Sequence, residues 1–202
     1  MKLSSIRKHS KDWTSASNMV PGLETSASAP FIKVWDVFVR VTHWTLAMTI
    51  ALAWLSTLSL GLTALHEPAG YMAVTLVLGR LVWGLSGSPY ARFSQFLRSP
   101  STVWRYVQDI CRGNEPHYLG HNPLGGWMVI ALLSNIALCG FTGWLFTTDR
   151  FWGIDWLQML HESLAWSLLL LIALHIIGVI FTSVRHRENL IRAMFSGKKP
   201  SL

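Results

Sequence analysis

Four of the eight histidines in this 202-residue chain lie within or at the edge of long apolar segments: His43, His66, His161 and His175. An ionisable side chain in a bilayer costs about 3 kcal/mol, so its presence there indicates a function. His161 and His175 are fourteen residues apart. On one helix this spacing puts them on nearly the same face, about 21 Å apart. They cannot bind one ion together, so each needs a partner on another helix.

Depth along the expected helices sorts the four histidines into two pairs. His43 and His175 lie at similar depths from one side, and we call them the inner pair; His66 and His161 lie near the other side and form the outer pair. Two imidazoles on facing helices at one depth suit the two axial positions of a haem iron. Zinc would need three or four ligands around one point, and each level offers only two histidines.

Four apolar stretches must position these side chains: Val37–Leu62, Ala69–Leu85, Leu124–Phe146 and Trp156–Val184. Each approaches or exceeds the roughly 20 residues that span a bilayer. Hydrophobic residues make up 51% of the chain and charged residues only 13%, where soluble domains carry about 25%. The mean hydropathy is +0.36. The sequence therefore predicts an all-α, integral membrane four-helix up-down bundle and excludes a disordered chain, a disulfide scaffold and a soluble nucleic-acid binder.

Basic residues predict the orientation of this bundle. Five lie in residues 1–36, four between the second and third stretches and five after residue 184, whereas the two short connectors hold only Arg150. The positive-inside rule then places both termini in the cytoplasm of a multi-pass protein of the bacterial cytoplasmic (inner) membrane. We expect three parts: a flexible cytoplasmic tail (1–30), a four-helix transmembrane domain (31–186) and a cytoplasmic C-terminal tail (187–202).

Other polar residues are candidates for contacts with a cofactor. Arg40 lies on the same helix face as His43, and Arg80 lies nearer the cytoplasmic end of the second helix. Both are expected to pair with propionates of an inner haem, although Arg40 has the alternative of reaching the lipid headgroups. His121 and Asn122 either contact a quinone or a propionate, or only begin a helix with Asn122 as N-cap. Apolar and basic residues alternate at helical spacing over 96–112, which predicts a short helix on the membrane surface.

Four runs carry a family resemblance: WDVFVRVTHW, HEPAGYMAVTLVLGRLVWGLSGSPYARF, GHNPLGGWM and ALHIIGVIFTSVRHRENLIRAMFSGKK. In these runs, which lie within residues 31–200, the chain resembles the prokaryotic cytochrome b-561 family. That family includes the b-type cytochrome subunit of nickel–iron hydrogenases. The resemblance implies an inner-membrane protein with two non-covalent haem b groups, bound by His43 with His175 and by His66 with His161. It also implies contact with the quinone pool on one side and with a redox partner on the other.

The expected function is transmembrane electron transfer through two bis-histidine b-type haems. Two histidines per iron leave no position open for oxygen chemistry, so such haems carry electrons. The expected exchange runs between the quinone pool and a periplasmic partner, such as a c-type cytochrome or a dehydrogenase subunit. One alternative is a membrane-anchoring subunit of a hydrogenase or other dehydrogenase complex, and a second is a divalent metal transporter that uses the same four histidines. A third is a purely structural membrane protein, which would tolerate the loss of any histidine.

Overall fold

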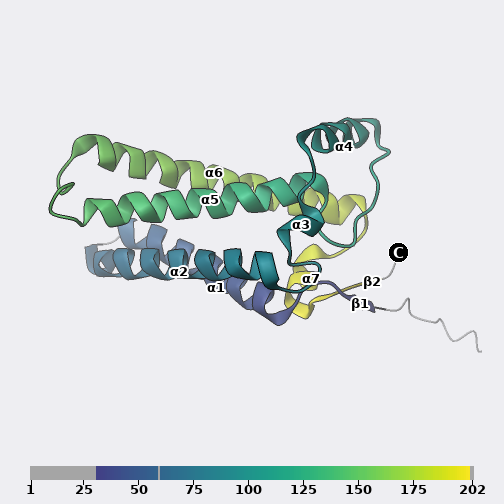
Figure 1. Cartoon of the computed structure of the whole chain (residues 1–202), viewed down its shortest axis with the longest axis horizontal. Helices are drawn as coiled ribbons and strands as arrows, with labels where there is room; N and C mark the ends of the chain where they lie inside the picture. The colour runs from purple at the N-terminus through teal and green to yellow at the C-terminus, as the bar shows by residue number, and fades with distance from the viewer. Residues whose placement is uncertain (1–30, 59, 201–202) are drawn as a thin grey trace, which may run out of the picture.

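The computed structural model describes residues 31–58 and 60–200, so the predicted flexible tail lies outside the described residues. Four long helices lie side by side along its long axis (Figure 1): α1 (Val37–Leu58), α2 (His66–Ser86), α5 (Pro123–Phe146) and α6 (Asp155–Arg185). All four are long and apolar enough to cross a membrane. The protein is therefore a multi-pass helical membrane bundle.

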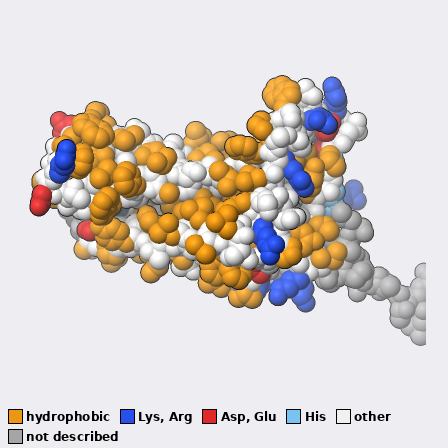
Figure 2. Space-filling view, viewed as in Figure 1, with side chains coloured by type: hydrophobic (Ala, Val, Ile, Leu, Met, Phe, Trp, Pro, Cys, Tyr) orange, Lys and Arg blue, Asp and Glu red, His pale blue; other side chains and the backbone are white. Residues whose placement is uncertain are grey.

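The two ends of the bundle differ in construction. At one end, the connector end, the 3₁₀ turn η1 (Leu60–Leu65) joins α1 to α2, and residues 147–154 join α5 to α6. The opposite end, the capped end, carries the remaining elements: α3 (Phe93–Phe96), α4 (Pro100–Arg112), α7 (Leu190–Ser196), β1 (Phe31–Lys33) and β2 (Lys198–Pro200). Figure 2 shows most of its visible Lys and Arg side chains at the capped end, and hydrophobic side chains along the helices.

Local sequence explains where the helices begin. α2 starts at His66, three residues before its predicted span; the first turn of a helix tolerates Pro68 and favours the negative charge of Glu67. At α5 the predicted N-cap is confirmed, because Asn122 Oδ1 accepts a hydrogen bond from Gly125 N at 2.6 Å. The predicted amphipathic helix is also present, but it starts at Pro100 after a short break. Proline disfavours helical backbone in the residue before it.

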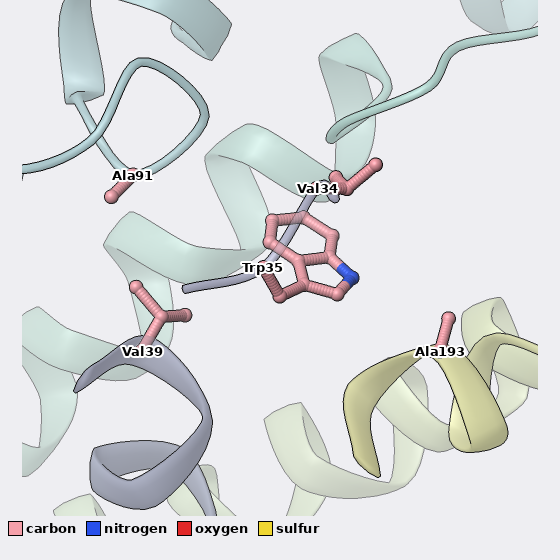
Figure 3. Packing of buried hydrophobic residues seen from close by; sticks show 5 residues of the cluster. All are labelled: Val34, Trp35, Val39, Ala91 and Ala193. Atoms are coloured by element: carbon pink, nitrogen blue, oxygen red, sulfur yellow. The ribbon is translucent and has the colours of Figure 1, made fainter. Parts of the chain in front are cut away.

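The capped end holds a small core that the sequence did not predict. Strands β1 and β2 pair antiparallel, with Ile32 opposite Lys199, and bring the C-terminal residues beside the start of α1. Five buried residues from segments far apart in the chain form the cluster shown in Figure 3: Val34, Trp35, Val39, Ala91 and Ala193. The residues predicted as a C-terminal tail are thus folded against the bundle as far as residue 200.

Asp36 fastens this core to the helices. Its carboxylate accepts hydrogen bonds from Val39 N at 2.8 Å, which caps α1, from Trp83 Nε1 at 3.0 Å and from the Ser88 hydroxyl. Burial acts to raise the pKa of Asp36, but these three hydrogen bonds and the charge of Arg80 outweigh it and lower the pKa. The start of α1 and the end of α2 are therefore held together by one ionised carboxylate.

A second apolar cluster fills the bundle itself. Its buried members come from α2, α5 and α6: Ala73, Val77, Leu133, Ile136 and Leu168. On α6, Leu168 is seven residues from both His161 and His175, so it lies between the levels of the two histidines. The core of the bundle separates the inner pair from the outer pair with aliphatic side chains.

Candidate functional site

The structure brings the inner pair together across the bundle. His43 on α1 and His175 on α6 face each other, with ring centroids 6.4 Å apart and an angle of 53° between the ring planes. The indole of Trp44 lies edge-on to His43, with centroids 5.1 Å apart, and stacks on Phe195 of α7 at 4.3 Å. The inner pair therefore lies at the capped end, beneath the folded C-terminal segment.

The outer pair has the same arrangement near the connector end. His66, the first residue of α2, and His161 of α6 have ring centroids 6.1 Å apart. His66 Nδ1 lies 2.9 Å from Ala53 O, and His161 Nδ1 lies 3.0 Å from Cys139 O. A carbonyl oxygen can only accept, so these contacts put the proton on Nδ1 of each ring. Nε2 of both histidines is left free to bind a metal, as second-shell hydrogen bonds achieve in metal sites.

These distances fit a six-coordinate iron between each pair. A metal–imidazole bond of about 2 Å plus a ring radius of about 1.1 Å puts the centroids of two opposed ligands about 6 Å apart. Both observed separations agree with that value. Among residues 31–58 and 60–200, no group of three or more His, Cys, Asp or Glu side chains could hold a metal ion. The donor sets thus fit haem, which brings four nitrogens of its own, better than zinc.

The glycines near the pairs differ in what a side chain at their position would meet. A Cβ at Gly84 would clash with the Phe93 ring, and one at Gly140 would clash with Val74, so these two permit close packing. At Gly143 a Cβ would lie 3.1 Å from His161 Cε1, so this glycine makes room for a ring of the outer pair. Gly70 and Gly178, one turn beyond His66 and His175 respectively, have no atom within 4 Å of such a Cβ.

Both predicted arginines lie at the capped end. Arg80 is 7% exposed; its Nη2 donates to Ala91 O at 3.1 Å, and its guanidinium lies 5.0 Å from the centre of the Phe93 ring. Arg40 donates from Nη1 to Phe195 O. Arg80 Nη1 and Arg40 Nε are buried and have no hydrogen-bond partner among the described residues. Each arginine therefore retains at least one donor for which the described residues supply no acceptor.

Three further nitrogen atoms, on the inner pair and its neighbours, also lack a hydrogen-bond partner among the described residues. Nδ1 of His43, Nε1 of Trp44 and Nδ1 of His121 are buried and have no hydrogen-bond partner in the described part of the chain. Buried donors are nearly always paired in native proteins, so this group indicates a missing acceptor. The sequence signal for His121 was only its place in GHNPLGG, and spacing could not show that its ring lies among the capped-end aromatics.

A separate charged cluster, with several of its side chains buried, lies at the capped end. Arg185 pairs with Glu115 at 2.7 Å, and Glu188 pairs with His117 and Lys199, each at 3.0 Å. Hydrogen bonds from Arg185 lower the pKa of Glu115. These ion pairs hold the segment before α5 against the end of α6 and the C-terminal strand. His117 belongs to this cluster.

Comparison with known proteins identifies the family. Residues 34–197 match the prokaryotic cytochrome b561 family. The chain belongs to this family. It is therefore a membrane b-type cytochrome of electron transport, and the family implies a b-type haem. The chain is also similar to a probable Ni/Fe-hydrogenase B-type cytochrome subunit of Bradyrhizobium diazoefficiens, with 22% identity over 87% of this chain and 89% of the relative. No solved structure matches the chain.

Proposed function

We propose that this b-type cytochrome carries electrons across the cytoplasmic membrane through two haem b groups. The inner haem would be held by His43 and His175, and the outer haem by His66 and His161. The observation that carries the proposal is the pair of ring separations, 6.4 Å and 6.1 Å, at two levels of one bundle. When bound, each haem iron supplies one-electron redox chemistry.

The protein contributes ligation, insulation and charge. Two imidazoles at each level would hold one haem iron, which would then carry electrons rather than bind oxygen or substrate. The aliphatic cluster around Leu168 keeps water out of the space between the levels. Arg80 and Arg40 would neutralise propionates of the inner haem, and the unpaired Arg80 Nη1 and Arg40 Nε support this role. A charge-assisted hydrogen bond of this kind is about twice as strong as a neutral one.

The orientation that we propose places the capped end in the cytoplasm, with the helices alternating in direction and both termini on that side. The excess of Lys and Arg at that end supports it. On the same basis residues 31–186 form the transmembrane domain, residues 1–30 a cytoplasmic tail and residues 187–202 its cytoplasmic cap. The connector end then faces the periplasm and carries four carboxylates: Glu67, Asp149, Asp155 and Glu162.

The electron partners that we propose are the quinone pool and a periplasmic protein. An acidic connector end favours association with a basic partner such as a soluble c-type cytochrome. The similarity to a hydrogenase cytochrome subunit supports a second candidate, in which the chain anchors a hydrogenase or another dehydrogenase to the membrane. A stable subunit that co-purifies with the chain would favour this second role over a free-standing quinol oxidoreductase.

The haem content of the purified protein tests the proposal. We expect sharp α and Soret bands on reduction and about two low-spin haems per chain, as bis-histidine ligation at both levels requires. His117→Ala is the matched control, because His117 lies in the charged cluster and should not alter the spectrum. A colourless protein that binds divalent metal would instead support a transporter, and a colourless protein that binds no metal and tolerates loss of any of the four histidines would support a purely structural role.

A further inference from the structure

His121 occupies a defined position at the capped end, immediately before α5. Its ring lies 4.7 Å from that of Trp35, edge-on, and 4.5 Å from that of Phe96. Both neighbours are buried, with 9% and 5% of their surface exposed. Two aromatic rings from different segments therefore fix the imidazole in one orientation, and its Nδ1 has no hydrogen-bond partner among the described residues.

The surroundings of His121 connect it to the inner pair. Phe96 contacts Phe93 at 5.8 Å between centroids, and Phe93 carries the Arg80 guanidinium on its face. Burial, followed by the charges of Arg80, His175, Lys199 and His43, lowers the pKa of His121 to about 3. The ring is thus neutral at physiological pH and has one N–H to donate.

The acceptor that fits this position is an anion. Arg80 and Arg40 each present an unpaired donor at the same end of the bundle. The nearby carboxylate of Asp36 already accepts hydrogen bonds from Val39 N, Trp83 Nε1 and the Ser88 hydroxyl. A carboxylate would accept such a hydrogen bond and add charge compensation for the guanidinium groups, whereas a neutral quinone would only accept the hydrogen bond.

We infer that His121 is a positioning residue for the inner haem, whose Nδ1–H donates a hydrogen bond to a propionate carboxylate beside Arg80. The inference rests on the proposed function and adds a protein contact that lies on neither ligand helix. Through this contact the segment before α5 holds the edge of the inner haem, while α1 and α6 hold its iron.

Two substitutions of His121 in the full-length, haem-loaded protein test this role. His121→Leu removes the donor and keeps an apolar side chain between Trp35 and Phe96. His121→Asn keeps a donor, because the side-chain amide nitrogen of asparagine lies near the position of Nδ1 in histidine. We expect the leucine variant to lower the midpoint potential of one haem, since the propionate charge then stabilises ferric iron more strongly. The asparagine variant should restore most of the potential, and the control His117→Leu should leave both potentials unchanged.

A second set of variants assigns the affected haem. In a His66→Ala background only the inner haem remains, and the shift caused by His121→Leu should persist; in a His43→Ala background it should be absent. Unchanged potentials in His121→Leu would overturn the inference, and if quinol oxidation slowed at the same time, His121 would belong to a quinone site. Equal shifts of both haems in the leucine and asparagine variants would overturn it as well, by showing a general structural effect. A wild-type protein without haem would instead overturn the proposed function.

Discussion

The pairing of the four histidines can be tested by haem stoichiometry in single and double alanine variants. Each pair, at 6.4 Å or 6.1 Å between ring centroids, can hold one iron. The levels are separated by the fourteen residues from His161 to His175, about 21 Å along α6, so one pair cannot supply a ligand to the other. Each single substitution should therefore reduce low-spin haem from about two to about one per chain.

The double variants make the prediction specific. His43→Ala with His175→Ala removes both ligands of one iron and should still leave about one low-spin haem, the same as either single variant. His43→Ala with His66→Ala removes one ligand from each iron and should leave almost none. The effects of two substitutions are non-additive when both residues hold the same iron, and they are additive when the residues hold different irons.

The assay combines a pyridine haemochrome measurement and protein quantification with low-temperature electron paramagnetic resonance of the oxidised protein. The haemochrome gives total haem, and the resonance spectrum distinguishes low-spin, six-coordinate iron from iron that has lost a ligand. The pairing would be refuted if the His43/His175 double variant retained much less low-spin haem than either single variant. It would also be refuted if the His43/His66 variant kept a full low-spin haem.

Three further predictions concern the outer pair, the capped end and the connector end. Gly143→Ala puts a methyl group 3.1 Å from His161 Cε1 and should shift the potential of the outer haem alone; equal shifts of both haems would contradict this. Asp36→Ala should lower stability by about 1 kcal/mol at neutral pH through loss of the N-cap of α1. Because folding lowers the pKa of Asp36, its stabilisation exists above the unfolded value of about 3.9 and disappears as pH falls through the folded value. The difference in free energy of unfolding between wild type and variant, measured with a denaturing detergent, should therefore narrow below about pH 4. A difference that does not change with pH would argue against a role for the charge of Asp36. Reversing Glu67 and Asp155 to Lys should slow association with a basic c-type cytochrome at low salt, as measured by stopped flow, and an unchanged rate would rule out docking at this end.

The elements that cross the membrane were predictable because their signal is local. About 20 apolar residues in a row identify a span whatever it packs against, and α5 and α6 begin and end within one residue of their predicted bounds. The helical repeat also gives the depth and face of each histidine. For this reason His43 with His175 and His66 with His161 could be matched before the structure placed them face to face.

The sequence by itself thus determined the four spans, the levels of the histidines and the unequal charge of the two ends, since each of these follows from periodicity, length or composition. Only the tertiary structure decided how the capped end is built. The contact of Arg40 with the carbonyl of Phe195 joins residues 155 positions apart, and Trp35 and Phe96 enclose His121 from two separate segments. Strands of three residues and a helix of seven carry no periodic signal. Their positions depend on the surfaces that the long helices present once the bundle has formed.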